Sequence, residues 1–147
     1  MTAGNIFLDT NILLRATIQQ FPLYAEVKKM VQAAIDNQVQ LWINRQVIRE
    51  YFNQVTRPQS FINPLPVEQV VIQYRNIKAL CKVCDENEET TASLIALITR
   101  YSIGGKQIHD ANIVATMLQN NITTLYTLNV DDMKRFDDQI SIVTLAK

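Results

Sequence analysis

Short apolar runs alternate along the chain with longer segments whose apolar residues recur at helical spacing. Four of these runs are rich in Ile, Leu, Val, Thr or aromatic residues, as buried parallel strands are: residues 5–9, 40–43, 124–128 and 141–145. Strands that alternate with helices usually form a parallel sheet with helices on both faces. The pattern therefore predicts an α/β fold, a three-layer α/β/α sandwich with a mostly parallel central sheet.

Helical spacing marks the segments between the runs. Apolar stripes cover residues 24–35, 47–55, 67–81, 92–98 and 111–118. The segment 92–98 is apolar nearly all round, so we expect it to be deeply buried. The last helix is expected to start directly after Asp110. Loops are expected at the three prolines between residues 58 and 66 and at Gly104-Gly105.

Length and composition favour one globular unit. A chain of 147 residues with 48% hydrophobic residues is enough for one sizeable core, and we expect a single domain over residues 1–147. No apolar run approaches the roughly 18 residues of a membrane span, and no signal-like N-terminus is visible. We therefore expect a cytoplasmic protein with no membrane partner.

Four acids are candidates for one reaction centre. Asp9 follows the first apolar run, Glu50 lies in a helix, Asp110 opens a late helix and Asp132 follows the run 124–128. Ligands of open α/β sheets gather at the carboxyl ends of strands. Clustered carboxylates repel one another unless a divalent cation neutralises them, and hard oxygen ligands suit Mg²⁺ or Mn²⁺. Such an ion activates water and stabilises charge on a phosphate, so phosphodiester hydrolysis follows.

The whole chain carries no strong basic field. It has 14 basic and 14 acidic residues, which counts mildly against nucleic acid as a partner. A bound cation would reverse the local sign, however, and several basic residues lie near the acids in sequence. The candidates for a phosphate track are Arg15, Arg45, Arg49, Arg57, Lys106, Lys134 and Arg135; the alternative for each is ordinary surface charge.

Four motifs give the chain a family resemblance. In order, they are Phe7-Leu8-Asp9-Thr10-Asn11, Val47-Ile48-Arg49-Glu50-Tyr51-Phe52-Asn53, His109-Asp110-Ala111 and Thr127-Leu128-Asn129-Val130-Asp131-Asp132-Met133. With these motifs the chain resembles PIN-domain ribonucleases, specifically the small toxins of VapC type. The resemblance implies an RNA substrate, a Mg²⁺ or Mn²⁺ cofactor, a cognate antitoxin protein and a homodimer.

The resemblance also assigns roles to residues. Asp9, Glu50 and Asp110 are the core acids, and Asp132 takes the fourth acidic position, with Asp131 as its alternative. The family has Asn or Asp where this chain has Asn129, and usually Phe where it has Met133; Asn129 is given a positioning role. Side chains that would orient carboxylate oxygens are Thr10, Asn11 and Thr127. Thr10 and Asn11 also fit an N-cap pair for the following helix.

Other classes of protein fit less well. A haloacid-dehalogenase-like phosphatase also begins with a strand and Asp, but Asn11 stands in place of that family's second Asp. A PIN-like domain that binds RNA or a partner without cleaving is a further alternative. Cys81 and Cys84 continue an apolar helical stripe, so we interpret them as core residues rather than zinc ligands. The single histidine, His109, excludes a multi-histidine metal site.

Overall fold

The computed structural model describes residues 4–145. Its sheet has five parallel strands in the order β3-β2-β1-β4-β5. The strands are β1 (Asn5–Leu8), β2 (Gln40–Asn44), β3 (Lys82–Cys84), β4 (Thr124–Tyr126) and β5 (Ser141–Val143). All of the pairs are parallel, and the central strand β1 is almost wholly buried, as the apolar run predicts.

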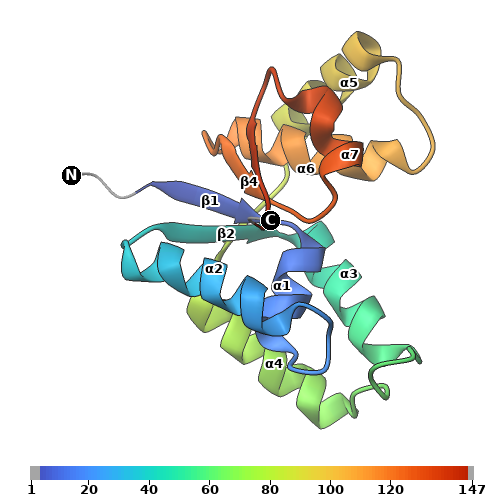
Figure 1. Ribbon diagram of the computed structural model, residues 1–147. Coiled ribbons are helices and arrows are strands. Elements are labelled where there is room, and N and C mark those ends of the chain that lie inside the picture. Colours follow the sequence, from blue (N-terminus) through green and yellow to red (C-terminus); the bar gives the residue numbers. More distant parts are fainter. Residues whose placement is uncertain (1–3, 146–147) are drawn as a thin grey trace.

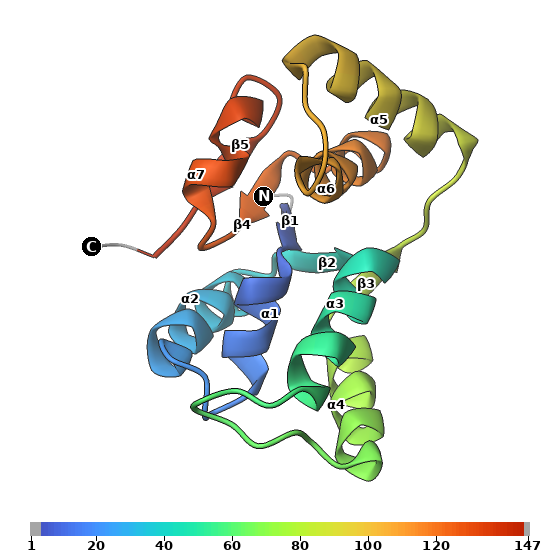
Figure 2. The same cartoon turned by 90° about the vertical axis from the view of Figure 1, so that its right-hand side faces the viewer.

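Helices cover both faces of this sheet (Figures 1 and 2). One face carries α1 (Thr10–Thr17), α2 (Tyr24–Asp36), α3 (Arg45–Thr56) and α4 (Val67–Leu80); the other carries α5 (Glu88–Tyr101) and α6 (Gln107–Gln119). A short helix α7 (Val130–Met133) and a 3₁₀ turn η1 (Lys134–Phe136) lead from β4 towards β5. The predicted α/β/α sandwich is confirmed.

The strand order reverses beside β1. The chain runs outward from β1 to β2 and β3, then crosses over the opposite face to place β4 on the other side of β1. The crevice beyond the carboxyl ends of β1 and β4 is therefore the switch point where ligands of such sheets bind. The strands end before the predicted limits, at Leu8 and Tyr126, so that Asp9 and Thr127 lie in the turns that face this crevice.

The strand β3 was not predicted. The apolar stripe of α4 ends at Leu80, Cys81 caps the helix, and residues 82–84 pair with β2 at the edge of the sheet. A strand of three residues that directly follows a helix has too few residues to show strand alternation. Both cysteines are nevertheless buried and unbridged, so the prediction of core packing is confirmed while their placement on one helix is wrong.

The prediction that residues 92–98 are deeply buried is also wrong. Within α5 only Thr90 and Leu97 are buried, and Ile95 is 58% exposed. The helix is the outermost element of its layer and packs against α6 along one side (Figure 2). Leu94 and Ile98 are therefore only half-buried against the core, and Ile95 faces solvent. Among residues 4–145, no helix has both the length and the apolar character needed to span a bilayer.

Candidate functional site

Asp9 is fixed at the junction of β1 and α1. Its backbone N–H donates to the carbonyl of Tyr126, 3.0 Å away, and its carbonyl accepts from the N–H groups of Ile12 and Leu13. The Asp9 carboxylate caps α1 by accepting from the Thr10 N–H at 2.8 Å, and it accepts from the Thr127 hydroxyl at 2.7 Å. Both strands of the switch point therefore hold this carboxylate in place.

Burial raises the pKa of Asp9 above its ordinary value. Hydrogen bonds from Thr127 and Thr10 act in the opposite direction, and the negative charge of Glu50 raises the pKa further. Burial thus outweighs the hydrogen bonds that favour the ionised form. A carboxylate in this position would be stabilised in its charged form by a nearby cation.

Glu50 is held between two helices. The Thr10 hydroxyl donates to Glu50 Oε2 at 2.7 Å, and the Gln46 amide donates to Glu50 Oε1 at 2.8 Å. The same amide nitrogen donates to the carbonyl of His109 at 3.0 Å, and Gln46 Oε1 accepts from Asn112 at 2.8 Å. Gln46 is buried and therefore fixes Glu50, on α3, relative to α6.

Asp110 lies in the first turn of α6, which begins at Gln107 rather than directly after Asp110 as predicted. Burial, followed by the negative charges of Asp9, Asp132 and Glu50, raises the pKa of Asp110 to about 6, although Arg135 acts in the opposite direction. These interactions show that the three other acids lie near Asp110. The acids that were predicted to gather do so around one helix start.

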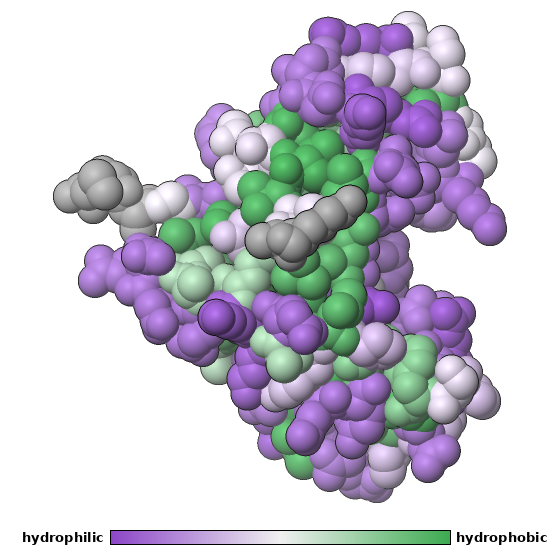
Figure 3. Space-filling model, viewed as in Figure 1, coloured by the Kyte–Doolittle hydropathy of each residue, from purple (hydrophilic) through white to green (hydrophobic). Residues whose placement is uncertain are grey.

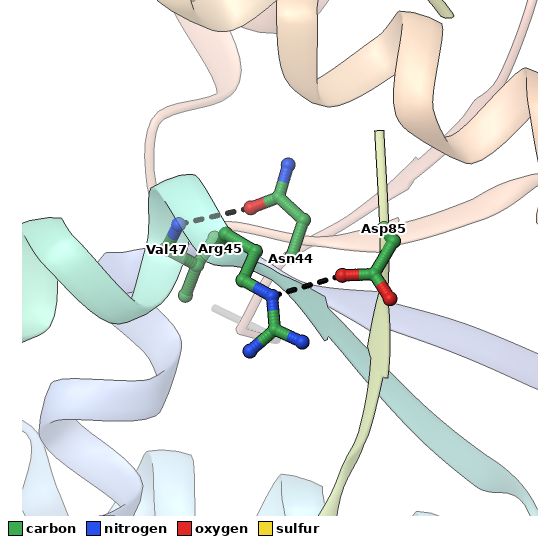
Figure 4. A network of polar contacts seen from close by, with 4 residues as sticks. All are labelled: Asn44, Arg45, Val47 and Asp85. Atoms are coloured by element: carbon green, nitrogen blue, oxygen red, sulfur yellow. Dashed lines mark hydrogen bonds and ion pairs between the residues drawn. The ribbon is translucent and has the colours of Figure 1, made fainter. Parts of the chain in front are cut away.

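The start of α3 is fixed by capping. Asn44 is fully buried, and its side-chain oxygen accepts from the N–H of Val47 at 2.9 Å. The next residue, Arg45, donates to Asp85 beyond β3 at 2.8 Å (Figure 4). The ion pair is exposed and contributes little, whereas the buried cap is worth about 1 kcal/mol. Asn44 therefore does more to set the position from which α3 presents Glu50.

The acids open into a cleft of about 360 Å³. It is lined by Asp9, Thr10, Asn11, Leu14, Arg15, Phe21, Glu50, Asn53, Gln54, Gln59, Phe61, Asp110 and Asn129. In the space-filling view the molecule is hollowed on the right-hand side, towards which β1 points, between the part with α5 and α6 and the part with α3 and α4 (Figure 3). Three of the four predicted acids line this cleft; Asp132 is exposed beside it.

The donor set fits a hard divalent cation. Asp9, Glu50 and Asp110 offer carboxylate oxygens, the ligands that Mg²⁺ and Mn²⁺ prefer, and the raised pKa values of Asp9 and Asp110 show that negative charge is unfavourable there without a counterion. Within residues 4–145, however, no three His, Cys, Asp or Glu side chains are arranged to coordinate one ion.

The smaller polar residues of the N-terminal motif have separate roles in the fold. Asp9, not Thr10 or Asn11, is the N-cap of α1, so that alternative is wrong. The Asn11 amide donates to Asp9 at 3.3 Å, and its oxygen accepts from the N–H of Leu128 at 2.9 Å. The Asn129 N–H donates to the Thr127 hydroxyl at 2.9 Å. These contacts tie the carboxylate of Asp9 to the loop after β4.

Gln46, which holds Glu50, was not predicted from the sequence. The signal was present, because residues four apart on a helix are neighbours and Gln46 precedes Glu50 by one turn. The loop residues of the cleft, Phe21, Gln59 and Phe61, were not predicted either. Long-range loop packing leaves no periodic pattern in a sequence, so no signal for these residues was available.

The basic residues predicted for a phosphate track lie in different parts of the surface, and the track itself stays a prediction. Arg15 lines the acidic cleft, and Arg135 lies near enough to Asp110 to lower its pKa. Arg45 and Arg49 instead border a second, apolar groove of about 380 Å³ between α3 and α4. Its other lining residues are Ile48, Phe52, Val70, Val71 and Tyr74, and we call it the α3–α4 groove.

One family model matches most of the chain. The family model of the PIN domain matches residues 6–139. No curated protein matches the chain. Among solved structures, VapBC2 of Rickettsia felis, bound to a DNA fragment of its promoter, is similar at a TM-score of 0.69 with 18% identity, over 97% of this chain and 99% of that one.

Two further structures have the same fold. The toxin VapC20 of Mycobacterium tuberculosis, which cleaves the sarcin–ricin loop, is similar at a TM-score of 0.67 with 13% identity, over 88% of this chain and 94% of that one. VapBC-1 of Haemophilus influenzae is similar at a TM-score of 0.67 with 18% identity, over 95% of this chain and 97% of that one. At identities this low, the structural similarity establishes a common fold and no more.

Proposed function

This chain belongs to the PIN-domain family, and from that premise we propose that it is a Mg²⁺- or Mn²⁺-dependent endoribonuclease that hydrolyses phosphodiester bonds. The observation that carries the proposal is the grouping of Asp9, Glu50 and Asp110 around the switch-point cleft, where burial and mutual repulsion raise the pKa of Asp110 to about 6. Acids held together at such a cost to their ionised forms are typical of cation sites.

In this proposal Asp9, Glu50, Asp110 and Asp132 hold the metal. When bound, the ion supplies a more acidic water and neutralises negative charge on the phosphate. Thr127 and Asn11 fix the Asp9 oxygens, and Thr10 with Gln46 fixes those of Glu50. Such supporting hydrogen bonds keep metal ligands in their productive orientation. Asn129 contributes through its main-chain N–H to Thr127 and through its place on the cleft wall.

Cleavage of RNA by the purified protein, with and without EDTA, tests the proposal directly. We expect cleavage with Mn²⁺ or Mg²⁺, none with EDTA, and no release of phosphate from small phosphate esters. RNA binding without cleavage in every metal would instead favour a non-cleaving PIN-like domain. Phosphate release from the small esters would favour the phosphatase alternative, which the comparisons do not support.

We further propose that the protein is the toxin of a toxin–antitoxin pair. The supporting observations are the VapBC complexes among its structural neighbours and the α3–α4 groove, whose apolar lining is bordered by Arg45 and Arg49. An antitoxin helix with apolar residues on one side and acids beside them complements this groove. A basic side chain of the same partner would compete with the metal among the acids.

Growth experiments test the toxin role. Expression of the chain alone from a tightly regulated promoter should arrest growth, and expression of Asp110→Asn at the same protein level should not. Equal growth of both cultures would leave a housekeeping ribonuclease as the better interpretation. The family resemblance also implies that two copies of this single-domain chain, residues 1–147, form a homodimer. The molecular mass in solution will test this.

A further inference from the structure

The cleft has a second end that contains no acid. Arg15 lies six residues beyond Asp9 along α1, about 9 Å at the rise of a helix. Other side chains of this end follow Glu50 on α3 or lie in the loops after α1 and α3. We call this region the outer end of the cleft, formed by Arg15, Phe21, Asn53, Gln54, Gln59 and Phe61.

Arg15 is the cation of the outer end. One of its terminal nitrogens donates to the carbonyl of Asn11 at 3.1 Å, and the guanidinium lies 5.6 Å from the centre of the Phe21 ring. Its Nε is buried and has no hydrogen-bond partner, and among residues 4–145 no acid forms an ion pair with Arg15. A buried donor without a partner is costly, so these donors are suited to an anionic ligand.

Two aromatic rings from different loops form the wall beside Arg15. Phe21 follows α1, Phe61 follows α3, and their ring centres are 4.7 Å apart in an edge-to-face arrangement. Phe21 is buried, whereas Phe61 is only half-buried and lines the cleft. Phe21 therefore supports Phe61, which keeps part of its ring available to a ligand.

Amide side chains complete this end. Asn53 is exposed on α3, one turn beyond Glu50, and lines the cleft beside Gln54. Gln59 donates to the carbonyl of Gln54 at 2.6 Å, which fixes the loop that carries Phe61. Amides form hydrogen bonds with the edges of nucleobases, and aromatic rings stack on their faces. Cation, ring and amide are the groups that recognise one nucleotide of a single strand.

We propose that the outer end binds the nucleotide next to the scissile phosphate, with Arg15 on its phosphate, Phe61 stacked on its base and Asn53 at the base edge. The inference rests on the proposed function, because it assumes that the acids act on RNA. It adds that the substrate is single-stranded at this nucleotide, since a paired and stacked base cannot lie against Phe61. The positive charge of Arg15 also offsets the acids, which would otherwise repel the RNA backbone.

Binding and cleavage of a labelled single-stranded RNA oligonucleotide of mixed sequence test the inference. Binding is measured in EDTA, where the acids cannot act, by fluorescence anisotropy over a range of salt concentrations. Arg15→Gln should weaken binding about tenfold and reduce the slope of log K against log salt by about 0.7, the share of one phosphate contact. Arg15→Lys should recover part of the affinity and the full slope.

The Phe61 variants separate stacking from charge. Phe61→Leu keeps an apolar contact for Phe21 and should weaken binding about tenfold without changing the salt slope; Phe61→Tyr should bind as the wild type does. In cleavage assays Arg15→Gln and Phe61→Leu should raise KM and leave kcat within about twofold. Arg75→Gln, which changes an exposed arginine on α4, is the control and should change nothing.

The outcomes distinguish this inference from the proposed function. If the wild type cleaves RNA and the Arg15 and Phe61 variants keep its KM and its affinity, the outer end does not bind the substrate. Equal affinity for duplex RNA would also overturn the inference. If the wild type binds single-stranded RNA through Arg15 and Phe61 but cleaves none with any metal, the nucleotide site stands and the nuclease proposal fails.

Discussion

Two faces of the helix α3 line two different hollows of the molecule. Glu50, Asn53 and Gln54 of α3 line the acidic cleft, whereas Arg45, Ile48, Arg49 and Phe52 line the α3–α4 groove. Each set recurs at intervals of three and four residues, the spacing of one helical face. The two hollows have nearly the same size, about 360 and 380 Å³, but different linings.

The difference in lining indicates a difference in purpose. Buried carboxylates are costly, so the acidic cleft is maintained by hydrogen bonds such as those to Glu50 from Thr10 and Gln46. The groove, in contrast, leaves Val71 44% exposed to water. A partner that covers the groove would bury this apolar surface, which is favourable. One helix therefore couples a site for charge chemistry to a surface suited for docking, and mutations can separate the two.

The largest effect is expected from Asp9→Asn. Loss of a supporting hydrogen bond to a metal ligand already costs about 10–100-fold, so loss of the ligand itself should lower RNA cleavage by more than about 100-fold. The fold should persist, because an amide removes charge repulsion from the cleft. Asp36→Asn is a matched control, since Asp36 is exposed at the end of α2 and does not line the cleft. Cleavage by Asp9→Asn at the wild-type rate would contradict the site assignment.

The second largest effect is a loss of affinity for the antitoxin, caused by a change in the α3–α4 groove. Val71→Asp places a charge where we expect an antitoxin helix, so the affinity for the cognate antitoxin should fall about tenfold or more, while RNA cleavage stays unchanged. Val67→Asp is the matched control, because Val67 is exposed on the same helix but does not line the groove. Equal affinity of both variants for that partner, measured with purified proteins, would place its docking site elsewhere.

The sequence predicts the sheet and the acids better than the surfaces between helices. Four strands and the position of Asp9 follow from local apolar runs, because a buried parallel strand leaves a continuous signal. The edge strand β3 and the exposure of Ile95 do not, since each depends on which element lies alongside in space. The outer end of the cleft depends in the same way on two loops that meet through Phe21 and Phe61.

The candidate acids were predictable individually, but their electrostatics were not. Asp110 is recognisable from its place beside a predicted helix start, yet its pKa of about 6 results from burial and from acids that are distant in sequence. Gln46 could be paired with Glu50 from helical spacing alone. Its contacts with His109 and Asn112 require the packing of α3 against α6.

A smaller effect concerns the stability of the metal-free protein. The pKa of Asp110 is raised from 3.8 to about 6 in the folded state, so folding favours the protonated form. Stability from this group is therefore lost as pH rises from about 4 to about 6. In EDTA, Asp110→Asn should be more stable than the wild type above pH 6 and nearly equal to it near pH 4, as measured by urea unfolding. A constant difference at all pH values would contradict this origin.

The smallest effect should come from the cysteines, which lie at the end of α4 and in β3. Burial raises the pKa of Cys81 to about 12 and that of Cys84 to about 11, so both are neutral thiols at physiological pH. Replacing both by Ala should lower the free energy of unfolding by about 1–2 kcal/mol, as small core deletions do, and should leave metal-dependent cleavage intact. Urea unfolding and cleavage rates of the double variant measure both effects. Stoichiometric zinc in the purified wild type that disappears in the double variant would show instead that the cysteines bind metal and are not simple core residues.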